Sequence, residues 1–505
     1  MAYKLMIQGT MSSAGKSFIV TGLCRLFSDL GYKVAPFKSQ NMALNSGVTF
    51  DGLEMGRAQI VQAEAGRTVP DVRMNPVLLK PNSDIGSQVI VMGKPIGNMK
   101  AREYYEYKKT LVPVIKDAFH SLENDYDVII VEGAGSPAEI NLKENDIVNM
   151  GIAKMFNIPV LLVGDIDLGG VFAQLLGTLE WLDNEEKDII KGFIINKFRG
   201  DVTLLKSGID MLTERTGKKV IGVVPYSKAQ IDEEDSVTVD LSRPKIIMQD
   251  TNTELSLRII VIRLPHMSNF TDFTPLERVS NVNLKYVNVV PDECPDLIII
   301  PGTKSTIKDL NWMKENGIAE YISRVADTIP VIGICGGYQI LGNTVSDPFH
   351  IEAEDKCEIG GLGLINQTTV IKEEKTLTRI SGIVDCTTGF FSYLNEKEYE
   401  GYEIHAGITE REEDGDKSNC LFGSGTNGNV LGTYVHGFFD KASVTKALIA
   451  ALLDKKYNNC LDEKEEILSS ICDYSETKDQ EYNVAADTIR NSIDINMLMD
   501  IMGMK

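Results

Sequence analysis

The feature that most constrains the fold of this chain is a cysteine between two glycines in the stretch Val331-Ile332-Gly333-Ile334-Cys335-Gly336-Gly337-Tyr338-Gln339-Ile340-Leu341-Gly342. An apolar run ends at the cysteine, and an amphipathic segment begins directly after it. This pattern predicts a strand, a sharp turn and a helix, because glycine permits a turn that a side chain would crowd. A helix N-terminus favours the nucleophilic thiolate. We therefore expect Cys335 to be a nucleophile, with the backbone amide of Gly336 as a candidate oxyanion donor.

A cysteine nucleophile needs a base, and the chain contains five histidines. His436 has the most suggestive setting, because it follows a short apolar, β-branched run at residues 431–435. Sites in α/β sheets form where strands end. We therefore expect His436 to be the base for Cys335.

Together these two stretches resemble the class I glutamine amidotransferase domain. The resemblance implies that Cys335 attacks the side-chain amide of glutamine and releases ammonia. It also implies that Gly302, in a Pro-Gly turn after an apolar strand, contributes an oxyanion amide. The family's usual glutamate two residues beyond the histidine is replaced here by Phe438. Asp440 and Glu403 remain the alternatives for the group that orients the imidazole.

The N-terminal half begins with a strand pattern that runs into Gly9-Thr10-Met11-Ser12-Ser13-Ala14-Gly15-Lys16-Ser17, and a helical pattern follows. Strand, glycine-rich loop and helix are the context of a phosphate loop. Backbone amides between Gly9 and Gly15, Thr10 among them, would hold the phosphates of ATP. Lys16 would neutralise them, and Ser17 would reach Mg²⁺. The loop is one residue longer than the standard pattern and in this resembles the dethiobiotin synthetase group.

Acidic and polar residues also follow later strands of this half. The strand at residues 127–131 ends in Glu132, which we predict to be a Mg²⁺ ligand, since strand ends face the phosphate loop in doubly wound folds. Asn196 ends another strand and is a candidate ATP-binding residue. A polar loop after the second strand and an acidic strand end supply candidate substrate-binding residues: Gln40, Asn41, Asn45 and Asp165.

The order of these patterns predicts two α/β domains. Strands that are almost entirely apolar are typical of a parallel sheet covered on both faces. We predict a phosphate-loop amide synthetase domain with a doubly wound parallel sheet at residues 1–230. A linker at 231–250 follows, then an α/β amidotransferase-like domain at 251–445 and a helical extension at 446–505. Within the extension, we expect residues 469–483 to form a loop or to be partly disordered.

Charge and cysteine content limit the partners and the location. The 505 residues carry a formal net charge of −21, which argues against a nucleic acid or an anionic membrane as the partner. No apolar run is long enough to span a bilayer, and the N-terminus lacks a secretory apolar region. The eight cysteines form no Cys-x-x-Cys pair. We expect a cytoplasmic protein, and its oligomeric state stays open.

The ordered motifs as a set resemble the cobyric acid synthase family. They are the phosphate loop, the polar loop at residues 38–46, the strand ends at Glu132, Asp165 and Asn196, the turn at residues 301–306, the cysteine turn and the His436 stretch. The resemblance implies ATP-driven amidation of the b, d, e and g carboxylates of adenosylcobyrinic acid a,c-diamide, with glutamine as the ammonia donor. Two alternatives stay open: the related cobyrinic acid a,c-diamide synthases, and a phosphate-loop ATPase scaffold with an inactive amidotransferase domain.

Overall fold

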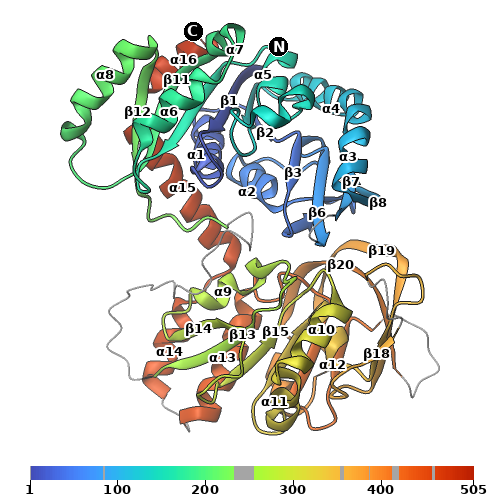
Figure 1. Ribbon diagram of the computed structural model, residues 1–505. Helices are drawn as coiled ribbons and strands as arrows, with labels where there is room; N and C mark the ends of the chain where they lie inside the picture. The colour runs from blue at the N-terminus through green and yellow to red at the C-terminus, as the bar shows by residue number, and fades with distance from the viewer. Residues whose placement is uncertain are drawn as a thin grey trace. The chain divides into compact units, whose positions relative to one another are not determined.

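The computed structural model of the protein describes residues 2–83, 86–232, 255–352, 358–385, 387–411, 420–457 and 461–504. The chain forms two compact units that interleave along the sequence (Figure 1). The first comprises Met1–Ala43, Glu54–Glu234 and Lys478–Lys505, and the second comprises Leu44–Leu53 and Asp235–Thr477. The domains predicted from the sequence, in contrast, were continuous. From residue 233 onward, the predicted linker lies outside the described part of the chain.

The first unit is built on a six-stranded sheet in which every neighbouring pair is parallel. Its strands are, in spatial order, β12 (Lys219–Pro225), β11 (Ile190–Phe198), β10 (Val160–Asp165), β1 (Tyr3–Gly9), β9 (Val128–Glu132) and β2 (Val34–Phe37). A second sheet contains β3 (Gln40–Met42), β6 (Val77–Ser83), β7 (Gly86–Val91) and β8 (Lys94–Lys100). The short strand β5 spans Glu54–Gly56.

Helices cover both faces of the six-stranded sheet. On one face, Leu5 and Ile7 of β1 share a buried core with residues of α1 (Lys16–Asp29), α15 (Tyr474–Ser492) and α16 (Ile495–Met502). On the other face, Phe37 of β2 packs against Phe119 of α4 (Val112–Asp125), which stacks on Phe156 of α5 (Met150–Phe156). The other α-helices described in this unit are α2 (Arg57–Ala65), α3 (Ala101–Tyr107), α6 (Val171–Glu180), α7 (Asn184–Ile189) and α8 (Lys206–Thr216). The prediction of a doubly wound parallel sheet is confirmed.

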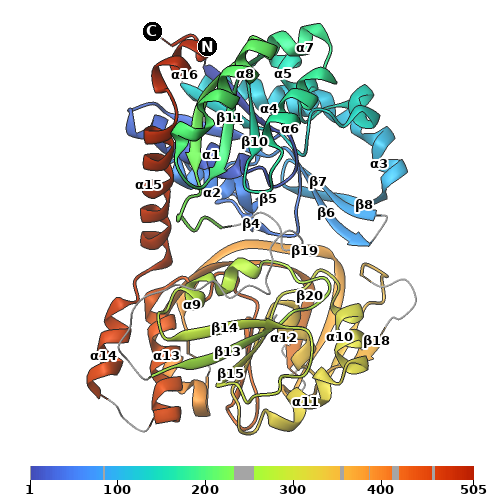
Figure 2. The ribbon, with the colours of Figure 1, turned by 60° about the vertical axis from the view of Figure 1, so that its left-hand side comes forward.

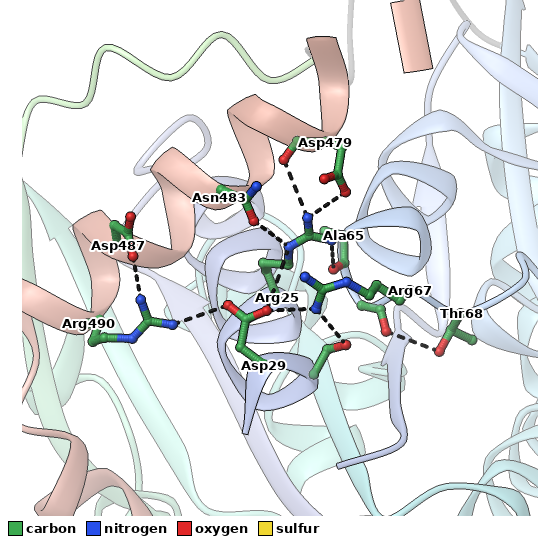
Figure 3. A network of polar contacts seen from close by, with 11 residues as sticks. Arg25, Asp29, Ala65, Arg67, Thr68, Asp479, Asn483, Asp487 and Arg490 are labelled. Carbon is green, nitrogen blue, oxygen red and sulfur yellow. Dashed lines mark hydrogen bonds and ion pairs between the residues drawn. The ribbon is translucent and has the colours of Figure 1, made fainter. Parts of the chain in front are cut away.

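The C-terminal helix α15 corrects the loop predicted over residues 469–483, because the helix begins at Tyr474. The sequence of α15 is strongly polar, and its side chains form hydrogen bonds and ion pairs with helix α1, which is distant along the chain. The guanidinium of Arg25 in α1 is fully buried, donates to Asn483 Oδ1 at 2.9 Å and pairs with Asp479 (Figure 3). Arg490 pairs with Asp29 of α1 at 3.1 Å. These contacts stabilise a helix whose local sequence carries only a weak apolar pattern.

The second unit contains a sheet with the spatial order β14 (Val282–Val287), β13 (Leu257–Ile262), β15 (Leu297–Ile300), β16 (Val331–Ile334), β22 (Val430–Thr433) and β21 (Phe422–Ser424). All neighbours in it are parallel except β21, which runs antiparallel to β22. Another sheet contains β18 (Glu358–Gly360), β17 (Thr344–Ser346), β19 (Gln367–Ile383) and β20 (Glu398–Arg411). The segment Leu44–Leu53 carries β4 (Ser46–Val48), which lies against β19 and β20 (Figure 2).

Helices pack on the parallel sheet of this unit around one large apolar core. They are α9 (Thr274–Glu277), α10 (Thr306–Glu315), α11 (Ile318–Val325), α12 (Gly336–Leu341), α13 (Ala442–Tyr457) and α14 (Leu461–Ser470). The predicted second α/β domain is therefore confirmed in its fold class. Among the described residues, no helix has the length and apolarity needed to cross a membrane.

Candidate functional sites

Cys335 sits at the turn between β16 and α12, as the sequence predicts. Its backbone has φ 52° and ψ −108°, a conformation that L-residues rarely adopt and that is typical of a strained functional turn. The turn is possible because its neighbours carry no side chain. A Cβ at Gly337 would lie 2.0 Å from the carbonyl oxygen of Ile300, and one at Gly336 would lie 2.6 Å from Cγ2 of Thr303. The glycines thus let the first turn of α12 approach the neighbouring strand end.

His436 lies three residues beyond the end of β22, the strand next to β16 in the sheet. Its imidazole is buried, and its ring Nδ1 is 2.7 Å from Oδ2 of Asp272. The other carboxylate oxygen of Asp272 accepts from the backbone amide of Gly437 at 3.0 Å. The ring also interacts with the Cys335 thiol. Cys335, His436 and Asp272 therefore lie together, all buried, in one unit, in an arrangement that a nucleophile, a base and an orienting acid require.

The electrostatics of this trio favour a charged imidazole. Burial by itself disfavours the positive charge of His436. The charge and hydrogen bond of Asp272, together with the neighbouring Cys335 sulfur, outweigh burial and raise the pKa of His436 to about 10. An imidazolium beside a thiolate is the ion pair that makes a cysteine nucleophilic near neutral pH.

Asp272 is the residue that the sequence prediction missed. It lies in the short helical turn Phe270–Phe273 that follows strand β13, inside a polar loop at the carboxyl edge of the sheet. Asp440 and Glu403, the alternatives drawn from the sequence, do not take this position. Glu403 instead pairs with a different histidine, His405, at 3.0 Å. The available signal was an acidic residue in the polar loop that follows strand β13.

The turn after β15 lies beside the candidate base. A Cβ placed on Gly302 would be 3.2 Å from Cε1 of His436, and the carbonyl of Gly302 accepts from the amide of Ser268 at 2.9 Å. Gly302 and Gly336 are thus both near the reactive groups, as the oxyanion prediction requires. Behind the turn, Asp309 is bonded to the His266 ring at 2.7 Å and to Thr303, which holds the turn in place.

The second candidate site is the phosphate loop between β1 and α1. Gly15 has φ 93°, and a Cβ there would lie 2.0 Å from Nδ2 of Asn196, so only glycine fits. Lys16 Nζ reaches across the loop to the carbonyls of Met11 at 3.1 Å and Gly135 at 3.2 Å. An ammonium in that position can neutralise phosphate oxygens held by the loop amides.

Glu132 joins this loop from the end of β9. Its Oε1 accepts from the hydroxyl of Ser17 at 2.9 Å and from Nζ of Lys38 at 3.0 Å, and Gln62 of α2 contacts the other oxygen. Burial favours the neutral acid, but Lys38 and its other partners outweigh burial and lower the pKa of Glu132. A hydroxyl and an ionised carboxylate side by side fit Mg²⁺, which prefers oxygen ligands. Lys38 lies in the polar loop predicted at residues 38–46, but neither Lys38 nor Gln62 was predicted to have a role at this site.

Three further residues predicted from the sequence, Asn196, Thr10 and Asp165, lie in or beside the phosphate loop. Asn196 donates to the carbonyl of Ala14 at 3.0 Å, inside the phosphate loop, and Thr10 donates to Gln174 at 3.1 Å. Asp165 also lies beside this loop, since Lys197 bonds both its carboxylate and the carbonyl of Ser13 at 2.8 Å.

The candidates of the polar loop fall in different places. Gln40 accepts from the hydroxyl of Tyr104 at 2.5 Å, and Asn41 donates to Gln59 at 3.0 Å, both within the first unit. Asn45 belongs to the second unit. The substrate roles given to these residues therefore stay predictions.

Comparison with known proteins identifies the two domains and the family of the chain. Residues 5–237 match the CobQ/CobB/MinD/ParA nucleotide binding domain, and residues 258–444 match the CobB/CobQ-like glutamine amidotransferase domain. The chain is 49% identical to a cobyric acid synthase of Ruminiclostridium cellulolyticum, over 99% of this chain and 97% of the relative. Cobyric acid synthases of Lachnoclostridium phytofermentans and Thermoanaerobacter sp. are 48% and 47% identical, each over 99% of both chains. The chain belongs to the cobyric acid synthase family.

Proposed function

We propose that this protein is a glutamine-dependent cobyric acid synthase. It amidates the b, d, e and g carboxylates of adenosylcobyrinic acid a,c-diamide and consumes ATP for each amide. The observation that carries this proposal is the presence, in one member of the family, of a Cys335–His436–Asp272 trio and a phosphate loop completed by Glu132. A scaffold without activity would not need both sets of residues.

In the amidotransferase unit, the Cys335 thiolate attacks the side-chain carbonyl carbon of glutamine. The backbone amides of Gly302 and Gly336 stabilise the oxyanion that forms. His436 donates its proton to the leaving nitrogen, the C–N bond breaks, and ammonia departs from a thioester. A water molecule, deprotonated by His436, then hydrolyses the thioester to glutamate and frees the thiol. Asp272 holds the imidazole in orientation through both steps.

In the nucleotide unit, a carboxylate oxygen of the corrinoid attacks the γ-phosphorus of ATP and gives an acyl phosphate and ADP. Lys16 and the loop amides bind the transferred group's oxygens. Ser17 and Glu132 are the residues that would hold Mg²⁺, which supplies charge neutralisation for this transfer. Ammonia then attacks the acyl carbon, a proton is lost, and phosphate leaves with formation of the amide.

We expect the protein to act in the cytoplasm.

The test is a nitrogen-source assay on the purified protein. ATP, Mg²⁺ and adenosylcobyrinic acid a,c-diamide are incubated with glutamine or with an ammonium salt, and corrinoid products are identified by mass. We expect stepwise addition of four amides with either nitrogen source. In a parallel incubation with cobyrinic acid, amidation at the a and c positions only would assign the related diamide synthase activity. The absence of ATP-dependent product from either corrinoid would refute an amide synthetase.

A further inference from the structure

The segment Leu44–Leu53 lies between stretches of the nucleotide unit in the sequence, yet it forms part of the amidotransferase unit. Its contact there is a closed ring of hydrogen bonds. The amide of Ser46 donates to Asn269 Oδ1 at 3.3 Å, Nδ2 of Asn269 donates to the hydroxyl of Tyr402 at 3.4 Å, and that hydroxyl donates to the carbonyl of Ser46 at 3.1 Å. In addition, the Arg379 guanidinium lies 4.3 Å from the ring centre of Phe50. Two residues of the segment, Ser46 and Phe50, thus contact three residues elsewhere in this unit: Asn269, Arg379 of β19 and Tyr402 of β20.

The two hydrogen-bond partners of Ser46, Tyr402 and Asn269, both lie close to groups that support the candidate base His436. Tyr402 stacks on the imidazole of His436 with ring centres 5.3 Å apart and planes 20° apart. The backbones of the same two residues exchange hydrogen bonds of 2.9 and 3.1 Å. Asn269, with φ 53°, begins the turn that carries Asp272. Displacing Ser46 therefore acts on both supports of the imidazole, its stacked ring and its orienting carboxylate.

The ends of the segment are covalently joined to the nucleotide unit at Ala43 and Glu54. Both junctions are fixed there: the amide of Ala43 donates to Leu79, and the carboxylate of Glu54 is buried in an ion pair with Lys80 at 2.9 Å. Directly after the second junction comes α2, the helix whose Gln62 contacts Glu132. A rearrangement around Glu132 on nucleotide binding can thus reach the segment through peptide bonds.

We propose that Leu44–Leu53 is a positioning element of the glutaminase site, and that Tyr402 and Asn269 are the positioning residues through which it sets the orientation of His436. It makes glutamine hydrolysis depend on the state of the nucleotide unit. This inference rests on the proposed function, because it needs a glutaminase and an ATP-dependent synthetase in one chain. Coupling between the two sites is measured as the ratio of the glutaminase rate with the synthetase substrates to the rate without them.

The experiment compares Tyr402→Phe with the wild type. This change removes the hydroxyl that bonds Ser46 and Asn269 but keeps the ring that stacks on His436. Glutamate production is measured with and without ATP, Mg²⁺ and adenosylcobyrinic acid a,c-diamide. We expect the wild-type rate to rise about fivefold or more on addition of these substrates. In Tyr402→Phe this ratio falls below about twofold, while amidation from ammonium salt is unchanged.

Tyr457→Phe is the matched control, because the Tyr457 hydroxyl also donates to a serine carbonyl of this unit, that of Ser256 at 2.9 Å. It should keep the wild-type ratio. A second variant, Asn269→Gly, removes the acceptor for Ser46 without strain at a positive φ, and should lower the ratio in the same way. A readout independent of turnover is the rate at which iodoacetamide alkylates the Cys335 peptide, followed by mass spectrometry. Addition of the substrates should change this rate in the wild type and not in Tyr402→Phe.

Two outcomes overturn the inference while leaving the proposed function intact. One is a wild-type protein that amidates from glutamine but whose glutaminase rate does not respond to ATP and the corrinoid. The other is a full wild-type response in both Tyr402→Phe and Asn269→Gly. Failure of the wild type to amidate from either nitrogen source would instead refute the proposed function.

Discussion

The ring Nδ1 of His436 lies 2.7 Å from the carboxylate of Asp272, although 164 positions separate the two residues in the chain. Phe438 occupies the position where related amidotransferases have an orienting glutamate, and its aromatic ring offers no acceptor oxygen. Here the carboxylate reaches the imidazole from the loop after β13 instead of from the segment after β22 that carries the histidine. The same acid also accepts from the amide of Gly437. It therefore fixes both the ring and the backbone beside it.

This pairing predicts the phenotype of Asp272→Asn. The amide favours the wrong ring tautomer and removes the charge that stabilises the imidazolium, so glutamine-dependent amidation should fall by about 100-fold or more. Amidation from ammonium salt should stay normal. The matched control is Glu403→Gln, because Glu403 pairs with His405. A larger loss in Glu403→Gln than in Asp272→Asn, measured as glutaminase kcat, would contradict the assignment.

Replacement of the candidate nucleophile tests the amidotransferase unit separately. Cys335→Ala should abolish glutamine hydrolysis, because no other group in the trio can form the thioester. Ammonium-dependent amidation should persist, since the nucleotide site is unaltered. The exposed cysteine Cys294 offers the control Cys294→Ala, which should match the wild type with both nitrogen sources. Glutamine-supported amidation by Cys335→Ala would show that the nucleophile lies elsewhere.

A substitution in the phosphate loop should impair amidation from both nitrogen sources and spare glutamine hydrolysis, the reverse of the effect of Cys335→Ala. Lys16→Ala removes the ammonium that neutralises the transferred phosphate, so amidation from glutamine and from ammonium salt should both fall by about 100-fold or more. Glutamine hydrolysis in the absence of ATP should remain. Lys4→Ala is a suitable control, because Lys4 is on the preceding strand and pairs with Glu123 at 2.9 Å. Near-normal amidation by Lys16→Ala would contradict a role for this loop in ATP use.

The raised pKa of His436 predicts a dependence of stability on pH. The pKa is about 10 in the folded protein against 6.5 for the free side chain. The stabilisation from the bound proton is therefore complete below pH 6.5 and is lost as the pH rises towards 10. Asp272→Asn lacks the main source of this stabilisation. Its deficit in free energy of unfolding, on the order of a few kcal/mol at pH 6.5, should shrink as the pH rises. Urea unfolding between pH 6.5 and 9.5 measures it, and a constant or growing deficit would contradict the ion pair.

The arginines beneath α15 predict unequal effects on stability. Arg25 is fully buried, so Arg25→Met leaves Asn483 and the carbonyl of Ala65 without this donor and should cost about 2–3 kcal/mol in free energy of unfolding. Arg490 belongs to the same network, but its side chain is 41% exposed. Arg490→Met should cost less than about 1 kcal/mol. Equal losses in chemical unfolding would show that burial of Arg25 does not set the strength of this contact.

Local sequence determined the elements whose cause is local. The glycine pattern around Cys335 and the phosphate loop predicted two strand-turn-helix units, because each depends on a turn that only small residues permit. Alternation of nearly uninterrupted apolar strands with helices predicted a doubly wound parallel sheet, and this is confirmed. The position of His436 after a strand also followed from neighbouring residues.

The tertiary structure decided which distant groups meet. The choice of Asp272 over Asp440 and Glu403 depends on how the loop after β13 folds at the carboxyl edge of the sheet, and no local pattern encodes that distance. The helix α15 is stabilised by partners in α1 and by Glu64 of α2, which contacts Lys478 and Tyr482. Its polar sequence alone therefore did not predict the first part of the helix. Leu44–Leu53 likewise belongs to the amidotransferase unit because of contacts with residues distant along the chain. The ring from Ser46 through Asn269 to Tyr402 spans three distant parts of the chain, and only folding brings them together.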